Sequence, residues 1–69
     1  MLERLRVLEE KNVGQRNEAT RLIAIVKTQL ELEQLWLSAV ESEQDFRRKA
    51  LANTAHETAE LYLAKAESL

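Results

Sequence analysis

The sequence predicts an all-α protein, and composition and hydrophobic periodicity are the two observations behind this prediction. The chain contains no proline and a single glycine, Gly14, while Leu, Ala, Glu, Gln, Arg and Lys dominate. These residues lose little on entering a helix, whereas the β-branched and aromatic residues that favour strands are scarce. Charged residues make up 32% of the chain and hydrophobic residues 45%, a mixture typical of coiled coils and long helices. The predicted fold is one long amphipathic helix that assembles into a coiled coil or multi-helix bundle.

The length of the chain is the observation that predicts assembly. A chain of 69 residues is one domain or part of one, and it is too short to bury a large core alone. It has no cysteine for disulfides, and one histidine without thiols does not supply a zinc site. Partner chains are the remaining way to bury apolar surface. We therefore expect residues 1–69 to be a single helical oligomerisation segment, taken from a larger scaffold, adaptor, tether or cytoskeletal protein.

The N-terminal sequence MLERLRVLEEK predicts an amphipathic helix, because leucines recur every three residues between charges. The next six residues, NVGQRN, are the weakest helical stretch of the chain. Asn12 and Gly14 would form a helix stop, after which Asn17 would cap a second helix. Since a lone glycine costs only about 1 kcal/mol against alanine, a continuous helix through residues 12–17 is preferred. A break at residues 12–17 is the alternative.

Residues 22–40 carry two apolar faces. At 100° per residue, one arc forms a coiled-coil seam in which Ile23, Leu30 and Leu37 are spaced seven residues apart. A second arc, which includes Trp36, lies on the opposite side of the helix. A dimer needs only one seam, and soluble chains rarely leave a further apolar face exposed unless it binds something. We therefore expect this stretch to be contacted on two sides, in a bundle of three or more helices or by a different protein.

The segment after Val40 is alanine-rich and is expected to form a tight single seam. Its apolar positions follow steps of three and four that approximate an eleven-residue repeat, which gives straight or slightly right-handed packing. Nothing from residue 18 to residue 69 obliges the chain to turn, so a continuous helix of about 50 residues or more is preferred. A hairpin that bends near residues 41–45, among serine and threonine cap signatures, is the alternative.

The predicted interaction residues follow from these faces. Trp36 is singled out, because tryptophan buries a large rigid area and is enriched at interface hot spots. The residues expected at the self-association interface are Leu22, Ile23, Val26, Leu30, Leu37, Val40, Leu51, Ala55, Ala59, Tyr62 and Ala66. The residues expected on the second, partner-binding face are Ile25, Leu32, Leu35, Trp36, Ala39 and Phe46.

The expected function is non-enzymatic: a homo-oligomeric coiled coil that acts as a scaffold, tether or adaptor segment. The alternative is a heteromeric recognition coiled coil whose second face around Trp36 binds a different protein. The sequence contains no nucleophile–base pair, metal-ligand cluster or phosphate-binding loop, so no catalytic residue, cofactor or small-molecule substrate is expected. His56 lies one helical turn from Glu60 and is expected to be a surface histidine.

Charge and hydropathy limit the expected partners. The net charge of −2 provides no strong field for nucleic acid, and the bases at residues 47–49 are expected to be solvated. Charged residues interrupt the most apolar window, so no membrane insertion is expected, and the N-terminus does not read as a signal peptide. Together with the absence of cysteine, this favours a cytoplasmic location. The expected partners are other copies of the chain or another helical protein, with oligomer number and helix direction left open.

Overall fold

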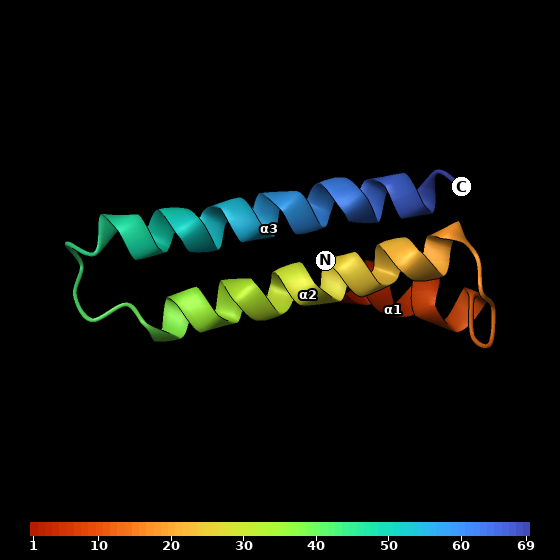
Figure 1. The fold of residues 1–69 in the computed structure, drawn as a ribbon, viewed down its shortest axis with the longest axis horizontal. Coiled ribbons are helices and arrows are strands. Elements are labelled where there is room, and N and C mark those ends of the chain that lie inside the picture. Colours follow the sequence, from red (N-terminus) through yellow and green to blue (C-terminus); the bar gives the residue numbers. More distant parts are fainter.

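The computed structural model describes residues 1–69 and contains three helices joined by two short connections (Figure 1). α1 spans Leu2–Lys11, α2 spans Glu18–Ser38 and α3 spans Phe46–Glu67. α2 and α3 run antiparallel as a helical hairpin, and α1 packs against one face of this hairpin, beside the first half of α2. The molecule is elongated, with extents of 43 × 18 × 17 Å. The predicted all-α class is confirmed.

The expectation of a single long helix is wrong, because the chain turns twice. Residues 39–45 leave the helical conformation and reverse the direction of the chain between α2 and α3. This turn lies where the alternative expectation, a hairpin near residues 41–45, had placed it. A hairpin suits so short a chain because α3 covers the apolar face of α2 without a second molecule. A continuous helix would leave that face in water until another chain arrived.

The break at residues 12–17 is also present, although a continuous helix was preferred. α1 ends at Lys11, and Gly14 adopts a φ of 74°, a left-handed conformation that glycine reaches without the steric cost of a Cβ. Asn17 caps α2, because its side-chain oxygen accepts a hydrogen bond from the Thr20 N–H at 3.0 Å. The polar residues that weakened the helical pattern therefore build a specific turn.

The core consists of branched aliphatic side chains from α1 and α2 packed on an alanine-rich side of α3. Val26, Ala59 and Leu63 are fully buried. Small alanine side chains let α3 approach α2 closely, as the sequence predicts for this segment, but the helix it approaches belongs to the same chain. The core cluster is Leu5, Leu8, Leu22, Ile23, Val26, Ala59, Leu63 and Ala66.

Candidate interaction surface

The residues predicted for self-association divide into a buried group and a partly exposed group. The buried group lies on the sides of α2 and α3 that face the interior of the molecule, so these side chains form the core of one chain and offer no open seam to another. The buried group is Leu22, Ile23, Val26, Ala55, Ala59 and Ala66. The half-buried or exposed group is Leu30, Leu37, Val40, Leu51 and Tyr62.

The second face predicted for α2 remains partly open to solvent. Leu35 is 62% exposed and Leu32 is 38% exposed, while Ile25 and Trp36 are half-buried. Their spacing of three, four and seven residues places these four side chains on one side of the helix. Of the two other residues predicted for this face, Ala39 is half-buried in the turn after α2 and Phe46 is 71% exposed at the start of α3.

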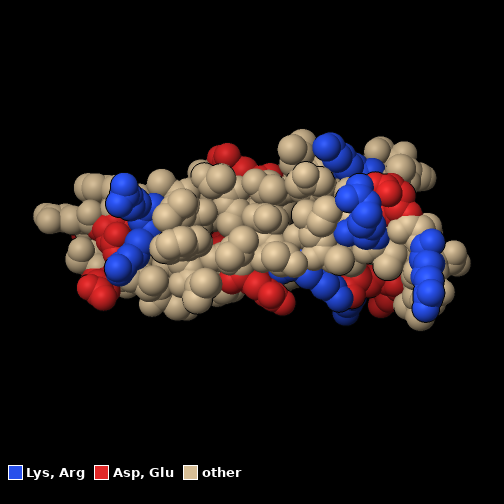
Figure 2. All heavy atoms as spheres, in the orientation of Figure 1, with Lys and Arg blue, Asp and Glu red and all other residues tan.

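This side of α2 faces away from α1. Lys27 marks the side that meets α1, because its Nζ lies 2.5 Å from Oε2 of Glu9. At 100° per residue, Ile25 points about 160° away from Lys27. α1 lies behind the hairpin in the view of Figure 1, so Figure 2, drawn in the same orientation, shows the face that α1 leaves open.

α3 extends the same open face with Leu51 and Tyr62. Leu51 is 39% exposed, and Tyr62 is half-buried with the Nζ of Lys65 5.0 Å from its ring centroid. Leu51 lies four residues before the buried Ala55, and Tyr62 lies seven residues after it. These intervals place all three residues on one side of α3. We define the outer face as Ile25, Leu32, Leu35, Trp36, Leu51 and Tyr62.

The centre of the outer face carries no charge. Figure 2 shows lysine, arginine, aspartate and glutamate side chains gathered toward the two ends and along the edges, with a broad uncharged area between them. At the end near the hairpin turn, Arg48 Nη1 lies 3.3 Å from Asp45 Oδ2. At the opposite end, Arg21 pairs with Glu18 and lowers the pKa of that carboxyl, chiefly through their hydrogen bond. An uncharged area that contains exposed leucines and has charged residues at its rim is typical of a protein-binding surface.

α1 is held on the opposite face of the hairpin by two leucines and two ion pairs. Leu5 and Leu8 are buried against the hairpin. Arg4 of α1 donates from Nε to Oε2 of Glu67 on α3 at 3.0 Å, and this hydrogen bond is the main reason that the pKa of Glu67 is lowered and that of Arg4 raised. The second ion pair joins Glu9 to Lys27 of α2. Each helix of the hairpin therefore contacts α1 through one ion pair.

His56 lies between two carboxylates, of which sequence spacing predicts only one. Its Nε2 lies 3.3 Å from Oε1 of Glu60, one turn along α3. Its Nδ1 lies 3.0 Å from Oε2 of Glu33 on α2, a contact that exists only because the chain folds back. Beside it, an open depression of about 570 Å³ lies next to the N-terminus of α1 and includes Leu30 and Met1 among its lining residues. His56 thus lies where the two helices of the hairpin meet, with a carboxylate from each helix close to its ring.

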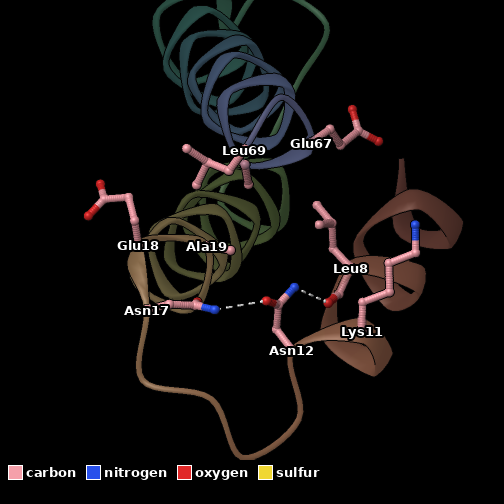
Figure 3. A pocket seen from close by; sticks show the side chains of 9 residues that line it. Leu8, Lys11, Asn12, Asn17, Glu18, Ala19, Glu67 and Leu69 are labelled. Atoms are coloured by element: carbon pink, nitrogen blue, oxygen red, sulfur yellow. Dashed lines mark hydrogen bonds between the residues drawn. The ribbon is translucent and has the colours of Figure 1, made fainter.

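A shallow pocket of about 430 Å³ lies at the open end of the hairpin, where all three helices meet (Figure 3). Asn12 donates from Nδ2 to the Leu8 carbonyl at 2.8 Å, and Asn17 donates from Nδ2 to Oδ1 of Asn12 at 3.2 Å. The structure holds no cluster of three or more histidine, aspartate or glutamate side chains arranged to bind a metal ion. None of the helices combines the length and apolarity needed to cross a lipid bilayer.

Comparison with protein families, curated proteins and solved structures gave no match. The fold and the surface define the class directly: a small helical hairpin with a third, short helix on one face and an uncharged, partly apolar face on the other. The outer face is the feature on which a function can be argued.

Proposed function

We propose that this protein is a non-enzymatic self-association module, in which two copies pack through their outer faces into a four-helix bundle that serves a scaffold, tether or adaptor. The observation that supports the proposal is the exposed, uncharged outer face of the α2–α3 hairpin. Soluble chains rarely leave such an area open unless another molecule covers it.

A second copy suits this face for a reason of symmetry. In a two-fold contact the same patch meets itself, so a charged centre would place like charges together. The centre of the outer face avoids that repulsion, because its charges lie at the ends and edges (Figure 2). Two antiparallel hairpins packed face to face form the ordinary four-helix bundle arrangement.

The open side of the hairpin is also long, because the molecule extends 43 Å along its longest axis. Trp36 and Leu32 supply the aromatic and aliphatic anchors that protein–protein interfaces depend on. The alternative occupant of the same face is a different helical protein.

Sedimentation equilibrium over a concentration series tests the proposal, with the variants Leu35→Glu and Leu2→Glu. Leu35 lies on the outer face and Leu2 on α1, and both are mostly exposed, at 62% and 72%. Neither substitution disturbs the core, so circular dichroism should show folded chains in both cases. We expect the wild-type chain and Leu2→Glu to associate with the same dissociation constant, and Leu35→Glu to associate about tenfold or more weakly, because the added carboxylate loses its water when the outer faces meet.

Two results would contradict the two-fold dimer. A wild-type chain that stays monomeric up to about 1 mM would exclude useful self-association at the affinities typical of such modules. If Leu35→Glu and Leu2→Glu weakened self-association equally, association would not use the outer face.

A further inference from the structure

We propose that the groove beneath α1 is an exchangeable helix-binding site whose second occupant is α1 of another copy of this chain. The groove lies on the opposite side of the hairpin from the outer face. The inference therefore goes beyond the proposed function and does not depend on it.

The groove has an apolar floor and a charge on each wall. Its floor includes Ile23 and Val26 of α2 and Leu63 of α3, all buried. One wall presents the ammonium group of Lys27, and the other presents the carboxylate of Glu67. A helix that fits this groove needs two apolar residues three apart, with one base and one acid placed to meet the two walls.

α1 meets this requirement with four residues. Leu5 and Leu8 fill the apolar floor, Arg4 pairs with Glu67 and Glu9 pairs with Lys27. An amphipathic helix in a groove is a recurrent recognition mode, and opposite charges on the two walls select one direction of the helix over the other. The groove is therefore complementary to α1 in particular, whichever copy supplies it.

The attachment of α1 within one chain is weak. α1 has ten residues, and isolated helices shorter than roughly 12–15 residues are marginal in water, so it depends on its contacts with the groove. Both ion pairs are solvent-exposed, with at least about a third of each side chain open to water, and such pairs contribute little. Short elements with few buried contacts open locally well before the whole domain unfolds.

The connection at residues 12–17 provides the hinge (Figure 3). Opening it breaks the hydrogen bond that Asn17 donates to Asn12 across the connection and releases Gly14 from its left-handed conformation. Once opened, α1 can extend beyond the open end of its own hairpin and enter the groove of a copy placed end to end with it. Every core contact and ion pair of α1 forms again in the second molecule, so the cost of exchange is confined to the hinge and to association.

The ion pair between Lys27 and Glu9 allows a direct test on the wild-type sequence. Equal amounts of chain at natural isotope abundance and of ¹⁵N-labelled chain are mixed at about 1 mM, the effective concentration of a short tether. One sample is incubated folded, and the other is unfolded together in denaturant and refolded. A carbodiimide then joins the Lys27 amine to the Glu9 carboxyl as an amide with loss of water, and mass spectrometry of the digest reads the labels.

We expect linked peptides with one label from each isotope in both samples, rising with chain concentration toward half of the linked product. The proposal would be overturned if both samples contained linked peptides with two identical labels but linked peptides with one label of each kind only at background level. Absence of any linked product would also overturn it, because α1 would then not occupy the groove in solution. A Lys27→Arg chain, which cannot be acylated at this position, verifies the identity of the product.

Two variants separate this contact from the outer-face dimer and from chance collision. Leu35→Glu should retain the mixed-label product, since the outer face takes no part in exchange; loss of the product in this variant would assign it to the outer-face dimer. Gly14→Ala penalises the closed turn but not the opened hinge, so it should raise the mixed-label fraction at chain concentrations where the wild-type fraction lies well below its limit of one half. An unchanged fraction would contradict the role of residues 12–17 as the hinge.

Discussion

Truncation of Leu63 to alanine tests the packing of α3 against α2 and α1. Leu63 is fully buried, whereas Leu61, two residues earlier on the same helix, is 57% exposed. Removing a buried leucine side chain costs its transfer free energy plus a cavity term, together about 3 kcal/mol. At 0.05–0.15 kcal/mol per residue, the whole chain is stable by roughly 3–10 kcal/mol. Leu63→Ala should therefore remove a third or more of the free energy of unfolding, and Leu61→Ala about 1 kcal/mol or less.

The assay is thermal and urea unfolding followed by circular dichroism, at low micromolar concentration so that self-association does not contribute. Since 1 kcal/mol shifts Tm by about 4–8 °C in a domain of this size, Leu63→Ala should lower Tm by about 12–24 °C. Leu61→Ala serves as the matched control, because it deletes the same atoms from the same helix. Similar losses at the two positions would refute the packing, since α3 would then have no buried side at Leu63.

Three further predictions concern the hinge, the helix cap and the ion pair on α1. Gly14→Ala should lower the free energy of unfolding by about 1–2 kcal/mol, and Gly14→Asn by less, because asparagine tolerates the left-handed conformation better; equal losses in urea titrations would argue against that conformation. Asn17→Ala should cost about 1 kcal/mol in the same assay and Asn17→Ser almost nothing, since serine restores the cap, so a full loss with serine would count against capping. Because Arg4 holds the pKa of Glu67 below its ordinary value of 4.5, their pair stabilises the folded chain above pH 4.5, and this stabilisation is lost as acid protonates the folded carboxylate. The Tm difference between wild type and Glu67→Gln should therefore shrink from pH 7 to pH 3, and a constant difference would contradict the pairing.

The features that could be predicted from the sequence are those set by neighbours along the chain. The all-α class follows from propensity, and the alanine-rich side of α3 follows from the spacing of Ala55, Ala59 and Ala66. The weak stretch at residues 12–17 and the capping role of Asn17 were also visible as local signals. Each of these depends on composition or on residues within about three helical turns of each other.

The direction of the chain after α2 could not be predicted in this way. Periodicity predicts that residues 22–40 are contacted on two sides, but it does not show whether α3 or another chain makes each contact. The turn at residues 39–45 contains no glycine or proline, and it is held by contacts made across it, such as the hydrogen bond that Arg48 donates to the Ala39 carbonyl. For the same reason, spacing along one helix could not predict the contacts His56–Glu33 and Arg4–Glu67, because each contact joins two different helices.

The two proposed contacts together determine what kind of assembly the chain would form. Each is a two-fold contact, so either one acting alone stops at a closed dimer. The outer face and the α1 groove lie on opposite sides of the hairpin, so one copy can engage both, and alternating contacts of the two kinds would join copies into an open chain. Wild-type protein should then show species larger than a dimer at high concentration, whereas Leu35→Glu, which keeps only the exchange contact, should stop at the dimer. Species larger than a dimer in Leu35→Glu would mean that exchange propagates from copy to copy instead of closing between two.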